Sequence, residues 1–423
     1  MELSSADQAI FATEVAGTSN PYANPNTTLA LVEQIEIDTE GKLSTPTGSP
    51  HHEQGCRAQG FVHPGILVNR GMLEFVRDKL VLGEQPWTGA LDRLRTSKFG
   101  DLSYAPHPRK VVGCGSYSNP DIGCSDEKED CAAAYTHALL WFHTGDPCHA
   151  EKSIEIMNAW SWVLEGHTLS NAPLQSAWVS ETFPRAAEII RYTYDGWSED
   201  DAIQFGRMLT NVYLPLIKNG SVANGNWETS MIDAVINIAV YNDDRELFEH
   251  GLSMWRERTP AYIYLESDGP TPLPPPRGNK TGGALTSFWN NQTTLVNGLS
   301  QETCRDISHA QYGLAGIINA AETAYIQGVD LYGEESDRIR HGLGFHAKYI
   351  NGADVPDWLC GGNLKYNWGL PMWEIGFNHF ATRLGFSMPQ TEQLTLGVRP
   401  TSSDHHMAWE TLTHGSIGWA GLK

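Results

Sequence analysis

The sequence has no long apolar run and few basic residues. No stretch of about 20 apolar residues occurs, which excludes a membrane-spanning helix. The 423 residues include 29 Lys and Arg against 50 Asp and Glu, for a formal net charge of −21. A chain this acidic is not expected to bind nucleic acid or an anionic membrane surface.

Several common functional motifs are also missing. The chain has no GxSxG nucleophile elbow, no HExxH zinc motif, no P-loop and no dinucleotide-binding fingerprint. None of its seven cysteines forms a CxxC pair, and no Cys/His spacing is typical of a zinc site. We therefore expect a protein that needs neither a metal nor another cofactor.

Two features indicate a secreted protein. The chain starts MELSSADQAIF, without a basic or apolar signal region, so we expect that a signal peptide has been removed. Sequons of the form N-x-[ST] occur at Asn26, Asn219, Asn279 and Asn291. Four cysteines crowd into residues 114–148, where disulfides are plausible, and the odd total leaves at least one thiol unpaired within the chain.

Helical periodicity dominates from residue 63 onward. Apolar residues recur at i, i+3, i+4 and i+7 in eleven segments: 71–82, 87–97, 129–144, 149–164, 182–195, 199–218, 229–241, 245–258, 306–327, 334–349 and 371–385. The only strand patterns are weak, at 29–37 and 391–398. So many helices joined by short turns predict an all-α protein, either an α/α toroid or a helical solenoid, and the lack of a strict repeat disfavours the solenoid.

The domain organisation follows from the same pattern. Residues 1–60 are polar and aperiodic, and we expect an extended N-terminal arm. Residues 61–423 form one α/α toroid in this interpretation, expected to be a monomer. Residues 266–303 are rich in Pro and Gly and are too long for an inert turn, which predicts a functional loop.

The segment after this loop carries polar groups of catalytic type. On a helical wheel Arg305, His309 and Tyr312 fall within about 60° of one another. The spacing of Thr303 and Asp306 resembles a capping box, which would place Glu302 just outside the helix. Each side chain alone is more often structural, but three on one stripe after a long loop favour a functional site.

A second segment reads Asn-Gly-Asn-Trp at 224–227 before an apolar helix. This is a turn signal, with Asn226 as a helix cap and Trp227 packed against the core as the plainest interpretation. An Asn amide at a helix N-terminus is also a good hydrogen-bond donor to a carboxylate.

These residue types match the needs of a uronide lyase. Such an enzyme removes a proton α to a carboxylate and expels the oxygen at C4 of the next sugar. It must first hydrogen-bond the carboxylate, for which Asn226 and Arg305 are suited. It then needs a base and an acid, and His309 and Tyr312, or Tyr312 in both roles, could supply them.

Several segments resemble the alginate-lyase-domain family, over roughly residues 60–400. The most specific are NGNW at 224–227 and the E-x-x-R-D-x-x-H pattern at 302–309; HPGIL at 63–67 and EIGFNHF at 374–380 also match. The resemblance implies an α/α toroid that cleaves alginate or glucuronan by β-elimination.

The resemblance also implies roles for individual residues. It places Asn226, Arg305, His309 and Tyr312 in the catalytic cleft. It further marks a set of substrate-binding candidates: Gln175, Trp178, Arg185, Trp227, Glu302, Tyr366 and His379, with Trp368 as a weaker one. Some alginate lyases carry an Asn-His pair whose His is the base, but here Trp227 follows Asn226. His309 is then the expected base, with His379 in reserve.

Two other functions stay open at this stage. A glycoside hydrolase on the same toroid, of the unsaturated glucuronyl hydrolase type, would need a pair of inward carboxylates. A non-catalytic carbohydrate-binding protein would use aromatic faces, and the chain has 14 Trp and 15 Tyr. The net charge disfavours a polyanionic substrate such as mannuronate-rich alginate or glucuronan unless the cleft is locally basic.

Overall fold

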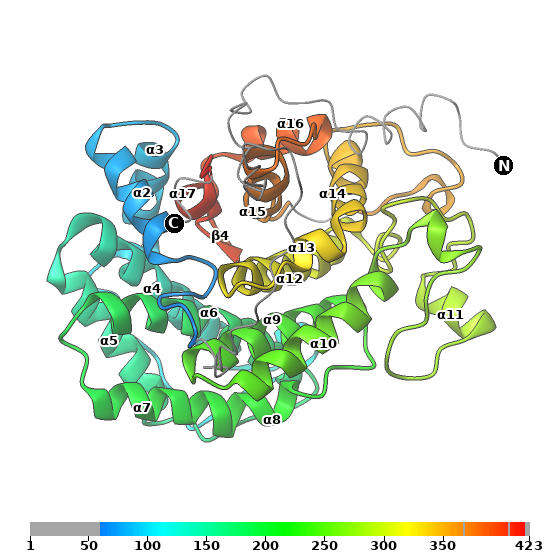
Figure 1. Ribbon diagram of the computed structural model, residues 1–423. Coiled ribbons are helices and arrows are strands. Elements are labelled where there is room, and N and C mark those ends of the chain that lie inside the picture. Colours follow the sequence, from blue (N-terminus) through cyan, green and yellow to red (C-terminus); the bar gives the residue numbers. More distant parts are fainter. Residues whose placement is uncertain (1–59, 367–368, 405–406, 419–423) are drawn as a thin grey trace, which may run out of the picture.

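The computed structural model describes residues 60–366, 369–404 and 407–418. The predicted arm apart from its last residue, its strand at 29–37, Cys56, the sequon at Asn26 and Trp368 lie outside these ranges. Helix and strand labels follow Figure 1.

Seven helices form an inner ring in which each contacts the next. In ring order they are α2 (Arg70–Val81), α4 (Cys124–Thr144), α6 (Ala172–Thr193), α9 (Gly225–Tyr241), α12 (Ile307–Ile326), α15 (Glu374–Phe377) and α17 (Glu410–His414), and α17 returns to α2. The prediction of an all-α protein with an α/α toroid is confirmed, because the inner helices close on themselves rather than stacking in a line.

The central helices of this ring are buried on every side. In α9, for example, every residue except Trp227 is buried. A helix without a polar face must lie between other layers of protein. This explains why α6 begins at Ala172, ten residues before the predicted start, since its first turns have no amphipathic period to detect.

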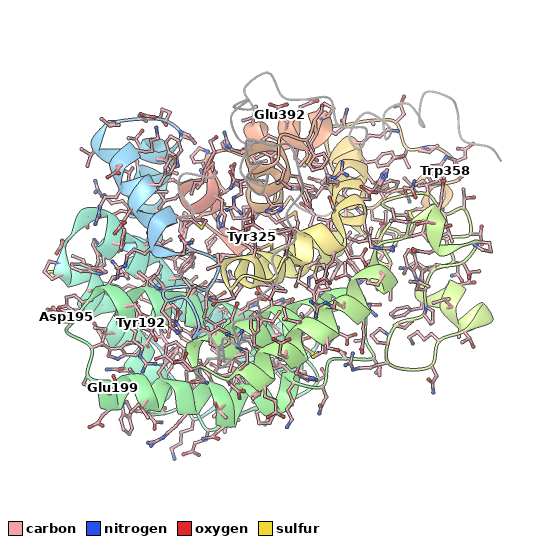
Figure 2. All side chains as sticks on the ribbon, in the orientation of Figure 1. Tyr192, Asp195, Glu199, Tyr325, Trp358 and Glu392 are labelled. Atoms are coloured by element: carbon pink, nitrogen blue, oxygen red, sulfur yellow. A yellow bond between two sulfur atoms is a disulfide. The ribbon has the colours of Figure 1, made fainter. Side chains whose placement is uncertain are left out.

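The remaining helices form an outer layer or close the ends. They are α3 (Trp87–Arg95), α5 (Pro147–Ser161), α7 (Glu199–Met208), α8 (Leu214–Ile217), α10 (Arg245–Tyr262), α11 (Gly282–Phe288), α13 (Leu331–Glu334), α14 (Ser336–Ile350) and α16 (Pro389–Val398). Turns of π-helix join α7 to α8 at Leu209–Tyr213 and extend α15 at Asn378–Arg383. Figure 1 shows α5, α7, α8 and α10 below the inner helices, and Figure 2 shows side chains filling the space between the layers.

One sequence prediction of secondary structure is wrong, and a few short strands were not predicted. The segment 391–398 is not a strand but most of α16, which starts with Pro389 at its first position, where proline is well tolerated. Strands that the sequence did not indicate form a small sheet in the order β2-β1-β3, from β1 (Val111–Cys114), β2 (Asp121–Ile122) and β3 (Gly166–Thr168). They are too short to show a period of two. A second pair, β4 (Ser403–Asp404) and β5 (Met407–Ala408), is antiparallel.

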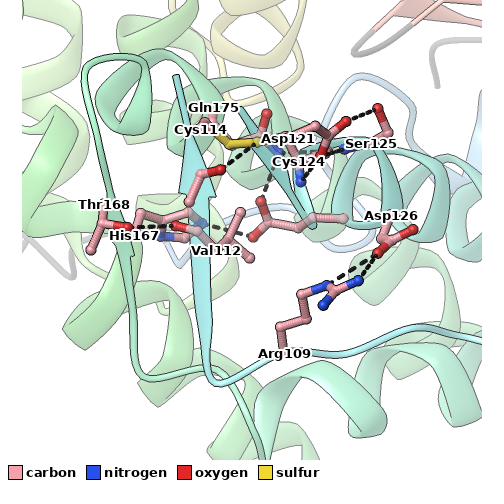
Figure 3. The surroundings of a disulfide bond; sticks show 12 residues. Arg109, Val112, Cys114, Asp121, Cys124, Ser125, Asp126, His167, Thr168 and Gln175 are labelled. Atoms are coloured by element: carbon pink, nitrogen blue, oxygen red, sulfur yellow. Dashed lines mark hydrogen bonds and ion pairs between the residues drawn. A yellow bond between two sulfur atoms is a disulfide. The ribbon is translucent and has the colours of Figure 1, made fainter. Parts of the chain in front are cut away.

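Two disulfides join connecting segments within the described part of the chain. Cys114–Cys124 joins β1 to the start of α4, as Figure 3 shows. Cys304–Cys360 joins the segment before α12 to the chain after α14. Cys131 is a buried free thiol and Cys148 an exposed one. The prediction of disulfides is confirmed, although only one of the two bonds lies in the cysteine-rich segment 114–148.

The long segment 266–303 is folded rather than loose. It contains α11 and packs its own apolar side chains against α14 and the chain after it. The buried residues of this cluster include Leu285, Trp289, Leu299 and Phe345. Within the part of the chain that the structure describes, no helix is long and apolar enough to cross a membrane.

His63 fastens the start of the described chain to the ring. Its Nδ1 lies 2.9 Å from Glu188 Oε2 and its Nε2 lies 3.2 Å from Asp243 Oδ1. The ring stacks on Tyr192 with centroids 4.3 Å apart. Burial acts to lower the pKa of His63, but hydrogen bonds and charge from Glu188 and Asp243 outweigh it and raise the pKa above its ordinary 6.5.

The interactions of His63 with Glu188 and Asp243 predict that the free energy of unfolding depends on pH. Because the folded-state pKa is raised, the His63 contribution is fully present below about pH 6.5 and is lost as pH rises through the folded-state value. His63→Gln should therefore lower the free energy of unfolding by up to about 1 kcal/mol at pH 6 and by less at pH 9. Denaturant titrations at both pH values measure the difference, with exposed His250→Gln as the control. A deficit that grows with pH would contradict the assignment.

Candidate active site

Arg305 does not lie on the helix where the helical wheel placed it. Helix α12 starts at Ile307 with Asp306 as its N-cap, so Arg305 lies in the preceding turn and not on the helix face. Glu302 also lies outside the helix, as the cap spacing predicted. The turn, and not helical periodicity, brings Arg305 to the site.

Glu302 is the centre of the site. It is fully buried and accepts hydrogen bonds from the Asn226 backbone N–H (2.8 Å), Asn226 Nδ2 (2.7 Å) and Arg305 Nη1 (2.8 Å). One buried carboxylate thus orients both groups that were predicted to bind substrate. Asn226 is inside the first turn of α9 and is not its cap, because the helix begins at Gly225, earlier than predicted.

Tyr262, from α10, packs between the two helix starts. Its hydroxyl donates to Glu302 Oε2 at 3.2 Å. A Cβ added to Gly225 would lie 2.1 Å from the Tyr262 ring, and one added to Gly313 would lie 2.0 Å from its hydroxyl. Burial, followed by the charge of Glu302, raises the pKa of Tyr262 far above its usual range, so the hydroxyl keeps its proton. Two glycines therefore let α9, α10 and α12 converge.

Asp306 holds His309 in place. Its Oδ1 accepts the His309 backbone N–H at 2.9 Å, and its Oδ2 lies 2.7 Å from His309 Nδ1. Burial acts to raise the pKa of Asp306, but the hydrogen bonds from His309 lower it overall, so the carboxylate is ionised at neutral pH. A carboxylate on Nδ1 sets the tautomer in which Nε2 carries the basic lone pair.

The aromatic rings of Tyr312 and Trp178 lie beside His309. The Tyr312 ring centroid is 6.3 Å from that of His309 and 5.9 Å from that of Trp178. Lys128 Nζ lies 5.2 Å from the Trp178 ring centroid. The structure thus brings Asn226, Arg305, His309, Tyr312 and Trp178 together; a cation, Lys128, stands at the edge.

Two tyrosines on loops border the same region. Tyr117 is 82% exposed and hydrogen-bonds the Arg305 guanidinium. Tyr366 is half exposed, and the carbonyl of its neighbour Lys365 accepts the Ile307 N–H at 2.9 Å. The predicted binding residue Tyr366 therefore lies by the start of α12. Tyr117 was missed, because a tyrosine between serines in a loop carries no signal in the sequence.

Two predicted binding residues of α6 are interior side chains. Gln175 is fully buried and donates to the Cys124 carbonyl (3.0 Å) and to Glu127 Oε2 (2.7 Å), beside the disulfide in Figure 3. Arg185 is 1% exposed and pairs with Asp233 at 2.8 Å. Neither is placed to meet a substrate from solution.

His379 also lies apart from the cluster around Glu302 and His309. It is 1% exposed and stacks on Tyr332 with centroids 3.8 Å apart, beside Tyr325, which Figure 2 labels on α12. Tyr325 is thirteen residues beyond Tyr312, about 20 Å along the helix. Burial lowers the pKa of His379 to about 3. The expectation that His379 shares the site with His309 is not met.

Trp227 is half-buried and packs against the main core. The residue after Asn226 is therefore a packed apolar side chain, as the turn signal at 224–227 predicted. Within the described ranges, no group of three or more His, Cys, Asp or Glu side chains is arranged to hold a metal ion.

Comparison with known proteins identifies the family. The sequence profile described as Alginate lyase matches residues 124–355, more than half of the chain, and this range contains the whole Glu302 cluster. The protein belongs to the alginate lyase family. It is a polysaccharide lyase. A search of curated proteins gives no significant match.

Several solved structures share the fold of this chain. Alginate lyase A1-III from Sphingomonas species A1 has a TM-score of 0.58 at 16% identity, covering 85% of this chain and 97% of that one. A Tyr-to-Phe variant of A1-III complexed with tetrasaccharide gives 0.56 at 18% identity, with 85% and 97% covered. An alginate lyase from Bacteroides ovatus gives 0.51 at 12% identity, with 84% and 99% covered.

The packing at Gly225 predicts a sensitive position. Gly225→Ala would press a methyl group against the Tyr262 ring, 2.1 Å away, and Arg258 Nη2, 2.6 Å away. We expect a loss of about 1–3 kcal/mol in the free energy of unfolding, together with reduced kcat because Asn226 is displaced. Gly283→Ala in α11, with no atom within 4 Å, is the control and should be neutral or slightly stabilising. Equal stability of the two variants, measured by denaturant unfolding, would contradict this packing.

Proposed function

We propose that this lyase cleaves a 1,4-linked polyuronate, either mannuronate-rich alginate or glucuronan, by β-elimination. The observation that carries the proposal is the Glu302 cluster, which aims an amide and a guanidinium at one place beside a tyrosine and an Asp-held histidine. The products would be oligosaccharides with a 4,5-unsaturated uronide end.

Asn226 and Arg305 serve to bind the uronate carboxylate in this proposal. Glu302 uses one hydrogen of Asn226 Nδ2 and one Nη of Arg305, and each group has further N–H donors. Charge that develops on the carboxylate as H5 leaves is stabilised best by donors that are already oriented. The buried carboxylate of Glu302 supplies that orientation.

His309 and Tyr312 serve as base and acid. His309, with Asp306 on Nδ1, presents Nε2 as the base that removes H5. Tyr312 then protonates the leaving oxygen at C4. Proton acceptor and donor would thus come from the first two turns of α12, close to the carboxylate-binding pair.

Local electrostatics support an anionic substrate despite the net charge of −21. Helices α9 and α12 both begin at the site, and a helix N-terminus favours negative charge. Arg305, Lys128 and the loop residue Arg277 add cations around it. The acidic residues of the chain therefore do not decide the potential within the cleft.

The carboxylates near the site favour a lyase over a hydrolase. A glycosidase needs two carboxyl groups that face the scissile bond. Here Glu302 accepts hydrogen bonds from Asn226, Arg305 and Tyr262, and Asp306 is hydrogen-bonded to His309. Both have orienting roles.

We further infer that the lyase is secreted and glycosylated. Two disulfides are consistent with an oxidising compartment. The three sequon asparagines within the described ranges are all exposed: Asn219, Asn279 and Asn291.

Substrate assays test the proposal directly. Polymannuronate, polyguluronate and glucuronan are incubated with the protein while ultraviolet absorbance of the unsaturated end and reducing ends are followed. Absorbance should rise with polymannuronate or glucuronan. New reducing ends without absorbance would indicate a hydrolase, and no new ends on any polymer would indicate a binding protein.

Replacement of Tyr312 tests the acid. Tyr312→Phe removes only the hydroxyl, so kcat should fall by about 10²-fold or more while oligosaccharide binding is retained. Binding is measured by calorimetry on the same sample. Tyr194→Phe, on the surface beside Glu151, is the control and should be fully active. A fully active Tyr312→Phe enzyme would overturn this mechanism.

The identity of the base can be separated from protein stability. His309→Gln should lower kcat by about 10²-fold or more without a loss of stability. Asp306→Asn should lower kcat with little change in KM, because it frees the other tautomer of His309. His379→Gln, by contrast, should lower the melting temperature and leave kcat per folded molecule unchanged. The reverse pattern would assign the base to His379.

A further inference from the structure

One amide ties the long loop to the active site. Gln301 Oε1 accepts the Gly225 N–H at 2.9 Å, and Gln301 Nε2 donates to the Phe288 carbonyl at 2.6 Å. Gly225 precedes Asn226, and Phe288 ends α11 within the segment 266–303. The position of Phe288 is therefore fixed relative to the carboxylate-binding pair.

Two cations pack against Phe288. Lys280 Nζ lies 4.7 Å from its ring centroid, and the guanidinium carbon of the buried Arg258 lies 5.9 Å from it. Phe288 and Lys280 are both half-buried, so the lysine is held over the ring while it stays in contact with solvent. The structure records no carboxylate within ion-pair distance of Lys280 among the described residues, although the chain is strongly acidic.

Arg277 fixes the other part of the loop. It pairs with the buried carboxylate of Glu228, two residues after Asn226. Glu228 Oε2 also lies 3.8 Å from Arg258 Nε. The pair packs against Gly220, where a Cβ would lie 2.4 Å from Glu228 Oε1. One Nη of Arg277 donates to Glu228, and the guanidinium has further N–H donors. The side chain of Arg277 is 26% exposed.

We propose that Lys280 and Arg277 form an additional subsite that binds the carboxylate of a second uronate residue of the polymer, next to the one held by Arg305. This proposal rests on the function proposed above. A polyuronate carries one carboxylate on every sugar, so a second fixed cluster of cations beside the catalytic pair engages a longer chain. The loop would thus set the preference for chain length.

The geometry favours a carboxylate at this place. Lys280 is preorganised by Phe288 and Arg277 by Glu228, which lowers the conformational entropy lost on binding. Arg258, Arg277 and Lys280 carry three positive charges against Glu228 and the nearby Glu257, so the cluster keeps positive charge for a ligand. The buried Arg258 connects this cluster to the start of α9, because a Cβ added to Gly225 would lie 2.6 Å from Arg258 Nη2.

Variants of Lys280 test the subsite. Lys280→Ala and Lys280→Glu are compared with wild type on polyuronate and on oligouronates of increasing length. Lys98→Glu changes an exposed lysine that pairs with Glu129 of α4, makes the same charge change and is the control. The proteins are made without N-glycans, because Lys280 lies inside the sequon of Asn279.

We expect Lys280→Glu to raise KM for the polymer and for long oligouronates by about tenfold or more, with kcat retained. Lys280→Ala should raise it several-fold, and the shortest cleaved oligouronate should be unaffected by either. Equal kinetics of Lys280→Glu and Lys98→Glu at all lengths would overturn the subsite while leaving the lyase function intact. Absence of elimination on every polyuronate would overturn the proposed function itself, and the subsite with it.

Discussion

The burial of the Glu302 carboxylate is the constraint on which the site depends. A charged group cannot stay in the interior without donors, and Asn226, Arg305 and Tyr262 provide them from three separate segments. Meeting this requirement fixes the turn before α12 against the start of α9. The same requirement leaves the remaining donors of Asn226 and Arg305 oriented in advance. The carboxylate binding that we propose for these two residues therefore depends on an arrangement that folding already requires.

The ring of helices serves this arrangement in a direct way. Glycines at 225 and 313 allow Tyr262 to lie between α9 and α12, which brings both helix N-termini to one place. Two disulfides and the Asp306 cap then hold the connecting segments. The net charge of −21 does not exclude the anionic substrate that we propose, because the potential at a partly buried site depends on nearby fixed groups more than on the net charge.

Much of this could be predicted from the sequence, and the failures have definite causes. Amphipathic helices such as α2 and α10 were located within a few residues of their starts. Helix α6 was only half recognised because most of its residues are buried and its first turns show no amphipathic period. The strands β1 to β3 are too short for a period of two. The helical wheel grouped Arg305 with His309 and Tyr312 on the assumption that all three lie on one helix. Arg305 precedes the helix, so the turn before α12 brings it to the other two residues.

The sequence by itself determined the helical class and the set of polar residues around α9 and α12, because these depend on local periodicity and on residue types. Periodicity left a toroid and a solenoid open, since the closure of the ring rests on contacts between distant helices. Tertiary structure decided which of those residues meet. It placed Gln175, Arg185 and His379 in the interior and gave Glu302 its orienting role. It also brought Tyr262 to Glu302 and Tyr117 to Arg305, and it set Lys280 over the ring of Phe288. Contacts between segments far apart in the chain leave no periodic trace, since they arise only when buried charges and packed rings must be satisfied together.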